Sequence, residues 1–265
     1  MELNILLNVS DIAIITGDNI FKSKQDFLIE FWRKNNKADF ENYQNITECI
    51  IQTDQDIINK VGNIKMDLTS KCTNDLSKLK KDIAENIKHL PKEEQKIITK
   101  SATNILNTDF GTRNENDALQ IYENMTGQKI VKDNRYRKKS IFENENISVS
   151  IGGRIDGINV ENGDIIEIKN RVHKLFYKLR DYEKVQLMCY LYIFDSKEGQ
   201  LVEAYKGSKD NININIINVP YNKDYMEKII ENIIMFAKFY KNFINDHNYK
   251  INLLNSPDLK ISFIL

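Results

Sequence analysis

The stretch GGRIDGINVENGDIIEIKNR, residues 152–171, decides the fold. It holds two apolar runs, RIDGINV (154–160) and DIIEIK (164–169), with the turn residues ENG between them. Apolar and β-branched runs bounded by turn residues favour strands, and a short Asn-Gly turn joins antiparallel neighbours. The segment therefore predicts a β-hairpin with ionisable residues on both strands.

Asp156 lies on one predicted strand of this hairpin, and Glu167 and Lys169 lie on the other. Glu167 and Lys169 are two residues apart, so both side chains point to one face of a strand, about 7 Å apart. The hairpin can bring Asp156 across from them. Two carboxylates near a main-chain carbonyl, for which Ile168 is the candidate, form a hard oxygen site that suits Mg²⁺ or Mn²⁺. Such a metal activates water, and Lys169 can stabilise the growing negative charge.

An ordinary cross-strand salt bridge on a solvated surface would give the same pattern. Glu94 and Lys96 form another E-x-K pattern, in a predicted helical stretch without other features of a catalytic site. What distinguishes Glu167 is its setting among isoleucines, where burying a lone charge is costly and a partner is needed. No cluster of cysteine or histidine competes for the metal, which disfavours zinc.

Three further polar residues are candidates for this site. Gln186 and Tyr190 are four residues apart in a predicted apolar helix, so they share one face. A glutamine there needs a hydrogen-bond partner, which is the active-site lysine, a catalytic water, a DNA phosphate or a nearby backbone group. Glu115 follows Thr112 by the spacing of a capping box, so it is either a helix cap or a third metal-site carboxylate.

The rest of the chain predicts an α/β (α+β) domain around a mixed sheet. Residues 1–110 are expected to be a helical region, in which Ser23 begins a helix and residues 41–100 form a polar helical insertion. Residues 111–265 are expected to form the core. Its predicted helices are 112–126, 176–194 and 222–248, and its predicted strands are 129–131, 147–153, 154–160, 164–169, 199–205 and 211–219.

Composition limits the classes of function. The 265 residues include 38 basic and 38 acidic side chains, so the formal net charge is zero. That argues against a protein that coats nucleic acid by bulk charge, but a local basic groove beside an acidic metal site would cancel in the sum. Three widely spaced cysteines suggest no disulfide framework, and no signal peptide or membrane span is visible. We therefore expect a cytoplasmic or nuclear protein that is not secreted.

Two basic runs are candidates for DNA binding, because lysine and arginine contacts to phosphates supply sequence-independent affinity. A solvated loop would account for either run. The second has more support because it starts beside Lys169, and Phe176 and Tyr177 within it can stack on an end base. The candidates are Arg137 and Lys138 in the first run, and Arg171, Lys174, Lys178 and Arg180 in the second.

These segments resemble a known family. Together with GTRNENDALQIYENMTG (111–127) and YEKVQLMCYL (182–191), the hairpin resembles the PD-(D/E)XK nuclease superfamily. Within it, the likeness is to the lambda-type exonucleases, or YqaJ-like viral recombinases, including those of large DNA viruses. Residues 10–32 also resemble that family's opening helices, whereas 33–110 match nothing. The resemblance implies a restriction-endonuclease-like core and a DNA nuclease that uses one or two Mg²⁺ or Mn²⁺ ions.

The resemblance also assigns roles to residues. Ile155 replaces the usual proline, and the family's arginine or lysine that meets a 5′-phosphate near the opening helix has only Lys22, Lys24 and Arg33 as nearby counterparts. By the family's motifs, Glu115 is the acidic residue of the first core helix, Asp156 the metal-binding aspartate, Glu167 and Lys169 the (D/E)XK pair, and Gln186 with Tyr190 the Q-x-x-x-Y motif.

We therefore expect an exonuclease that resects double-stranded DNA ends in recombination, replication or repair. The alternatives are a structure-selective endonuclease on the same scaffold and a nucleic-acid-binding protein with a degenerate core. An RNA target also fits, because nothing here reads a 2′-hydroxyl. The resemblance further suggests a single-strand-annealing recombinase as partner and a homo-oligomer.

Overall fold

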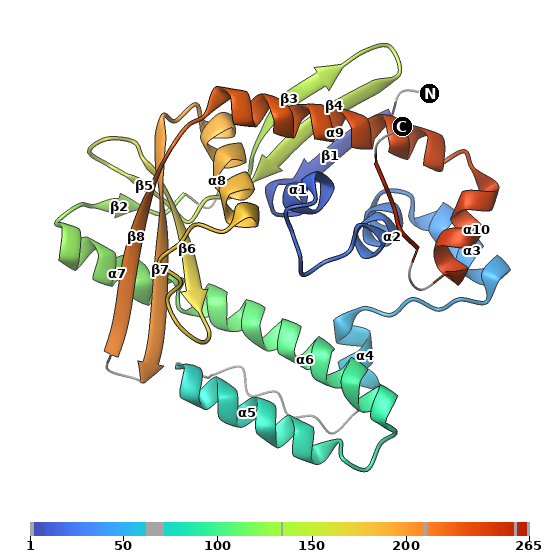
Figure 1. Cartoon of the computed structure of the whole chain (residues 1–265), viewed down its shortest axis with the longest axis horizontal. Helices are drawn as coiled ribbons and strands as arrows, with labels where there is room; N and C mark the ends of the chain where they lie inside the picture. Colours follow the sequence, from blue (N-terminus) through green and yellow to red (C-terminus); the bar gives the residue numbers. More distant parts are fainter. Residues whose placement is uncertain (1–2, 62–71, 134, 209–210, 257–258, 264–265) are drawn as a thin grey trace.

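The computed structural model of the chain describes residues 3–61, 72–133, 135–208, 211–256 and 259–263. Two mixed sheets are flanked by helices (Figure 1), which confirms the expected α+β class. The three-stranded sheet has the order β1-β4-β3, formed by Leu3–Asn8, Ile147–Gly153 and Arg137–Glu143. The five-stranded sheet has the order β2-β5-β6-β7-β8, formed by Ile130–Val131, Gly157–Asn159, Ile165–Arg171, Glu198–Ser208 and Asn211–Pro220.

Helices cover the five-stranded sheet on both faces. β6 pairs antiparallel with β5 and parallel with β7, and the parallel pair is joined by a crossover through α8 (Asp181–Phe194). Helix α7 (Glu115–Thr126) packs on the face that carries Ile166 and Ile168. The opposite face of β6 carries Glu167 and Lys169 because side chains alternate along a strand. That face is turned toward α8.

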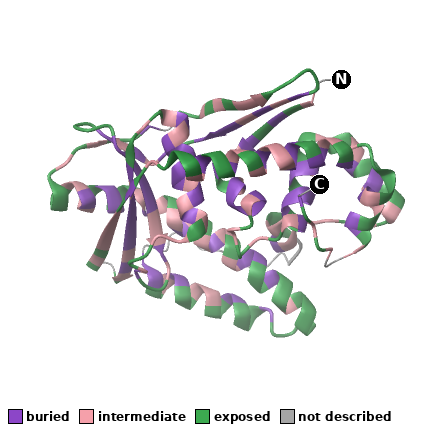
Figure 2. Cartoon of the chain, turned by 45° about the horizontal axis from the view of Figure 1, so that its top comes forward, coloured by how far each residue is buried: buried purple, intermediate pink, exposed green. Residues whose placement is uncertain are grey.

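The main hydrophobic core lies between the three-stranded sheet and four helices. The buried residues of β4 are Ile147, Val149 and Ile151, which pack with apolar side chains of the helices in one cluster. Figure 2 shows this buried layer along the inner faces of the elements. The helices are α1 (Val9–Thr16), α2 (Lys24–Asn35), α8 and α9 (Lys223–Phe243), while α3 (Lys37–Thr47) and α10 (His247–Asn255) extend the cluster.

A second, smaller core stabilises the helices α4 (Asp54–Val61), α5 (Thr73–Asn86) and α6 (Lys92–Arg113). Its buried side chains include Leu76, Ile83 and Leu106. The polar stretch expected as an exposed insertion therefore has an interior of its own, although most of its surface is polar. No helix of the described residues is long and apolar enough to span a membrane.

The structure corrects two expectations about the first part of the chain. Residues 1–110 are not purely helical, because β1 pairs in parallel with β4 and joins a sheet. The expected boundary at residue 110 also falls inside α6. The helix predicted to start at Thr112 starts at Glu115 instead, because α6 runs through Thr112 and ends at Arg113. The proposed capping box is therefore wrong.

Candidate active site

The β5–β6 hairpin brings the three central candidates together. Gly157 pairs with Ile166 across the antiparallel strands, which sets Asp156 opposite Glu167. The Oδ2 atom of Asp156 accepts a 2.7 Å hydrogen bond from the backbone N–H of Ile168. Burial is the main cause that raises the pKa of Asp156, and this hydrogen bond opposes the rise. This hydrogen bond holds the Asp156 carboxylate against β6 and does not use its other oxygen, Oδ1.

Glu167 is the electrostatic centre of the site. Its Oε1 atom accepts hydrogen bonds from Lys169 Nζ at 2.7 Å and from Gln186 Nε2 at 2.9 Å. Its Oε2 atom is buried and has no hydrogen-bond partner among the described residues. Burial raises the pKa of Glu167 to about 7, although the charge of Lys169 counteracts this. A buried carboxylate oxygen without a partner is costly and points to a missing cation or water.

Helix α8 supplies the polar groups that hold the lysine. Gln186 Oε1 accepts from Lys169 Nζ at 2.9 Å, and its Nε2 also donates to Tyr190 Oη at 3.4 Å. Of the partners that the sequence allowed for this amide, the structure shows the lysine, and the amide also donates to Glu167. A Cβ at Gly153 would lie 2.8 Å from the Tyr190 ring, so a larger residue on β4 would displace that tyrosine.

Glu115 approaches from the first turn of α7. Its pKa is raised mainly by burial and also by the negative charge of Asp156, so the two carboxyl groups influence one another. Lys132 Nζ lies 3.6 Å from its Oε2 atom. In the part of the chain that is described, no three acidic, histidine or cysteine side chains are gathered as a ready metal cage.

The donors present nevertheless fit a small divalent cation. Mg²⁺ usually keeps several waters and needs only one or two carboxylates. The unpaired Glu167 oxygen and the neighbouring Asp156 carboxyl provide these, and both carboxyl pKa values are raised in the metal-free chain. Glu115 remains the candidate for a third ligand, and the carbonyl of Ile168 stays a prediction.

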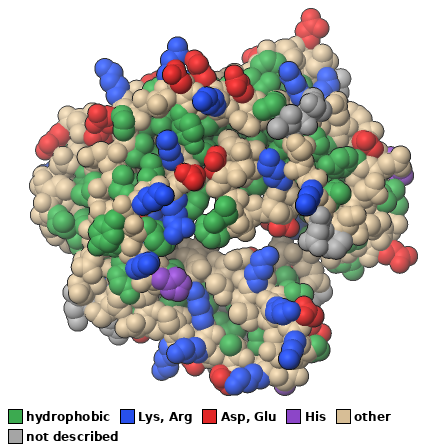
Figure 3. Space-filling model, in the orientation of Figure 1, with side chains coloured by type: hydrophobic (Ala, Val, Ile, Leu, Met, Phe, Trp, Pro, Cys, Tyr) green, Lys and Arg blue, Asp and Glu red, His purple; other side chains and the backbone are tan. Residues whose placement is uncertain are grey.

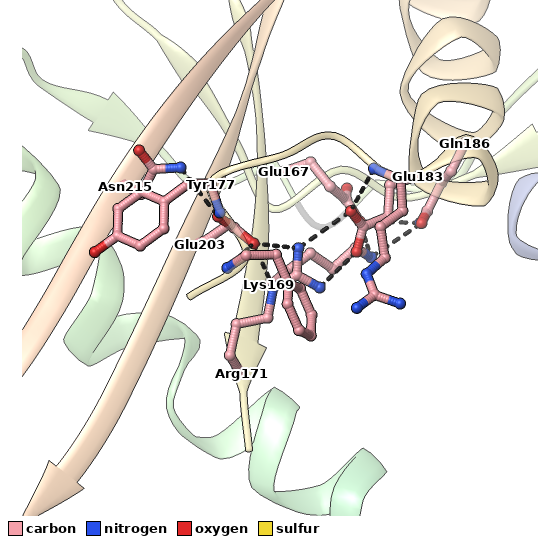
Figure 4. Close-up of polar contacts among 10 residues, drawn as sticks. Glu167, Lys169, Arg171, Tyr177, Glu183, Gln186, Glu203 and Asn215 are labelled. Carbon is pink, nitrogen blue, oxygen red and sulfur yellow. Dashed lines mark hydrogen bonds and ion pairs between the residues drawn. The ribbon is translucent and has the colours of Figure 1, made fainter. Parts of the chain in front are cut away.

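Arg171 is buried and not on the surface, where the sequence analysis placed it. It was expected to contact DNA, but it is buried between two glutamates that are also buried. Its Nη1 lies 2.5 Å from Glu183 Oε1, and its Nη2 lies 2.7 Å from Glu203 Oε1 (Figure 4). Glu183 stands one turn before Gln186 on α8. Arg171 thus ties β6 to β7 and to the start of the helix that holds the catalytic candidates.

The loop between β6 and α8 is anchored by the same network. Glu203 accepts hydrogen bonds from the backbone N–H of Phe176 at 3.2 Å and of Tyr177 at 2.9 Å. The Phe176 ring lies between two guanidinium groups, 4.6 Å from that of Arg171 and 3.7 Å from that of Arg180. The loop therefore has fixed attachments, while Lys174 and Lys178 in it are exposed.

The end of the first basic run, from Arg137 on, lies in a strand rather than in a loop. Arg137 begins β3, pairs with Asp133 at 3.2 Å and lies over the Phe194 ring at 4.6 Å. Lys138 follows on the strand and is exposed. β3 was missed because its polar residues lack a buried face of their own, and it becomes a strand only by pairing with β4.

One candidate for substrate binding was missed. Arg154 is exposed and lies two residues before Asp156, with the buried Ile155 between them. The guanidinium of Arg154 lies 5.6 Å from the Tyr136 ring centre, and no carboxylate of the described residues pairs with it. The two-residue spacing from Asp156 was the sequence signal that could have revealed it.

The surface around these elements is hollowed and basic. Figure 3 shows Lys and Arg side chains gathered around a hollow, with few acidic side chains among them. A pocket of about 370 Å³ lies beside the β6–α8 loop. Its lining includes Phe176, Lys178, Arg180 and Tyr182 from the loop and the start of α8, and Asp18 and Ile20 from the segment after α1.

Comparison with known proteins identifies the core. Residues 63–193 match the YqaJ-like viral recombinase domain. The match contains every candidate from Glu115 to Tyr190. It also covers residues 63–110, which were expected to lie outside the family, and it leaves out residues 10–32. No curated protein sequence matches the chain.

Several solved structures are similar in fold. LHK-Exo in complex with dAMP is 11% identical, with 90% of this chain and 89% of that chain covered and a TM-score of 0.47. LHK-Exo is an alkaline exonuclease from Laribacter hongkongensis. A phage-related exonuclease from Haemophilus somnus 129PT is 13% identical, with 91% and 96% covered and a TM-score of 0.45.

Proposed function

We propose that this protein is a metal-dependent exonuclease that degrades double-stranded DNA from its ends, because residues 63–193 match the YqaJ-like viral recombinase domain. The observation that carries the proposal is the contact set of Glu167. One of its oxygens is held by Lys169 and Gln186, and the other is buried and unpaired beside Asp156. A buried carboxyl with a raised pKa beside a specific charged partner is typical of functional sites, which favours an active enzyme over a degenerate one.

Asp156 and Glu167 would hold Mg²⁺ or Mn²⁺, with Glu115 and the Ile168 carbonyl as further ligands. When bound, the metal would lower the pKa of a water and offset negative charge on the phosphate. An ammonium group has three donors, and two of those of Lys169 are directed to Glu167 and Gln186. The third can orient the attacking water or meet a phosphate oxygen. Tyr190 holds the Gln186 amide, and through it the lysine.

The basic side chains around the hollow would bind the DNA backbone. Lys174 and Lys178 are exposed in the loop that follows the catalytic strand, and Lys138 is exposed on β3. Arg154 adds an exposed cation two residues before Asp156 in the chain. Phosphate contacts of this kind do not distinguish sequences, so we expect a nuclease without sequence specificity. A recombinase partner and a homo-oligomer stay predictions from the resemblance.

We expect the protein to shorten linear duplex DNA while closed circular duplex of the same sequence stays intact. The reaction would attack any phosphate that reaches the site, so end dependence must come from access to the hollow. The measurement is a time course on linear, nicked and closed circular DNA with Mg²⁺, in which the linear form releases mononucleotides. Rapid linearisation of the closed circle would instead favour the structure-selective endonuclease. Equal degradation of single-stranded RNA would extend the substrate to RNA.

Metal binding should depend on pH through Glu167. Its pKa of about 7 lies above the ordinary 4.5, so the metal-free fold loses stability as pH rises between these values. A metal requires the ionised carboxylate and therefore displaces the proton. Following the melting temperature against Mn²⁺ concentration, we expect a midpoint about tenfold higher near pH 6 than near pH 8.

The variant Glu167→Gln should remove this metal-dependent stabilisation, and Glu161→Gln, an exposed carboxylate of the hairpin turn, should retain it. A midpoint that is the same at both pH values would contradict the assignment of Glu167 as a ligand. Full cleavage activity in excess chelator would contradict metal dependence altogether.

A further inference from the structure

We propose that Tyr177 is a base-stacking residue that receives an unpaired nucleobase of the strand being degraded. The inference rests on the proposed DNA nuclease function and adds how the strand end is held. Tyr177 lies in the loop between β6 and α8, and its side chain is 71% exposed. Three observations carry the proposal: its backbone conformation, its anchoring and its surroundings.

The backbone of Tyr177 has a conformation that is unfavourable for a tyrosine. Its φ is +54°, in the left-handed region that bulky residues rarely adopt. Of the non-glycine residues described, two others have positive φ, and these are Glu48 and Asp195, the C-caps of α3 and α8. A left-handed residue is the ordinary way to end a helix, but Tyr177 ends none. Asparagine or glycine would fit this turn better, so the ring needs an explanation beyond the turn.

Buried contacts hold Tyr177 in this conformation close to the catalytic strand. Its backbone N–H donates to Glu203 Oε2 at 2.9 Å, and Glu203 is fully buried. Glu203 and Lys169 are directly paired across β7 and β6. The Glu203 side chain therefore connects the Tyr177 backbone directly to the β6–β7 strand pair that carries Lys169. Figure 4 shows the ring directed away from the buried ion pairs, so it takes no part in them.

The surroundings of the ring fit an unpaired nucleotide. Among the residues that the structure describes, no aromatic ring or cation covers Tyr177, whereas the neighbouring Phe176 is enclosed by two guanidinium groups. Exposed Lys174 and Lys178 flank it, and Arg180 lines the adjacent pocket. Free aromatic faces beside basic side chains bind single strands irrespective of sequence, since every base has a stacking face. A continuous duplex keeps its bases stacked on one another, so the occupant is a base freed at an end.

The test compares Tyr177→Phe, which keeps the ring, with Tyr177→Asn, which suits a positive φ but cannot stack. The probe is a linear duplex with an unpaired terminal 2-aminopurine, bound in Ca²⁺ to limit turnover. Loss of one stacking contact corresponds to about 10- to 100-fold weaker binding. We expect Tyr177→Asn to show that loss and a matching rise in KM, with kcat within about threefold and an unchanged or higher Tm. Tyr177→Phe should resemble the wild type, and so should Ile50→Asn, which alters an exposed apolar side chain between α3 and α4.

Wild-type 2-aminopurine quenching and KM in Tyr177→Asn would overturn the proposal and leave Tyr177 as a turn residue. The outcome separates this inference from the proposed function. If the wild type degrades DNA and the asparagine variant is unaffected, only the stacking role fails. If the wild type quenches the probe but cleaves nothing, the nuclease proposal fails while the stacking role stands.

Discussion

Replacing Lys169 by alanine will lower the rate of DNA cleavage by about 10²- to 10³-fold, the usual effect of removing one group that stabilises transition-state charge. Its ammonium group is held by Glu167 and Gln186, within the same contact set as the unpaired carboxylate oxygen. The Kd for DNA should stay within a few-fold, because many phosphate contacts supply the affinity. Single-turnover cleavage of end-labelled duplex with Mg²⁺ measures the rate, and binding in Ca²⁺ measures the Kd.

Glu167→Gln should lower the rate to a similar extent, because the amide cannot bind the metal as a carboxylate does. The matched control is Lys96→Ala, which removes the exposed lysine of the other E-x-K and should leave the rate unchanged. Near wild-type turnover in either site variant would show that the wrong residues have been assigned. A tenfold or larger loss of the cleavage rate in Lys96→Ala would also show that the wrong E-x-K has been assigned.

Replacing Arg171 by methionine will destabilise the fold by about 3–5 kcal/mol, because it leaves two buried carboxylates without their counter-ion. Arg171 donates to both Glu183 and Glu203, and these two glutamates are 1% and 0% exposed. The free energy of unfolding in urea is the quantity to measure.

The control is Arg135→Met, because Arg135 is mostly exposed although it also pairs with an aspartate. Its free energy of unfolding should change by no more than about 0.5 kcal/mol, as for most surface positions. If Arg171→Met instead kept its stability and lost only DNA affinity, the buried arginine would be a DNA contact after all. The sequence-based expectation would then be restored.

The catalytic hairpin could be predicted because its information is local. Strand periodicity places Glu167 and Lys169 on one face, and the ENG turn brings Asp156 back to them within a dozen residues. The signals for helix starts are equally local. The Ser23 side chain accepts a hydrogen bond from the backbone N–H of Asp26, and the Asn222 side chain accepts one from the backbone N–H of Tyr225, as N-cap residues do. Such interactions depend on neighbours in the chain, so a single sequence is enough to find them.

The elements that the sequence analysis missed or misplaced depend on partners far away in the sequence. β1 pairs with β4 across about 140 positions, and neither its six residues nor those of β3 carry a turn or periodicity strong enough to identify them alone. Thr112 could cap a helix by its spacing, but packing of α6 extends that helix past it. Tertiary packing thus overrode a weak local preference, which is the common way that such predictions fail.

For the site, the sequence by itself determined which residues are candidates for the chemistry, and the tertiary structure decided what each of them touches. Residue types and spacing singled out Asp156, Glu167 and Lys169. Only the fold shows that Gln186 holds the lysine, that Arg171 is buried between glutamates from two other elements, and that Tyr177 is exposed at a positive φ. The reason is physical: charge and hydrogen-bonding capacity belong to a side chain, whereas burial and partners depend on which elements pack around it.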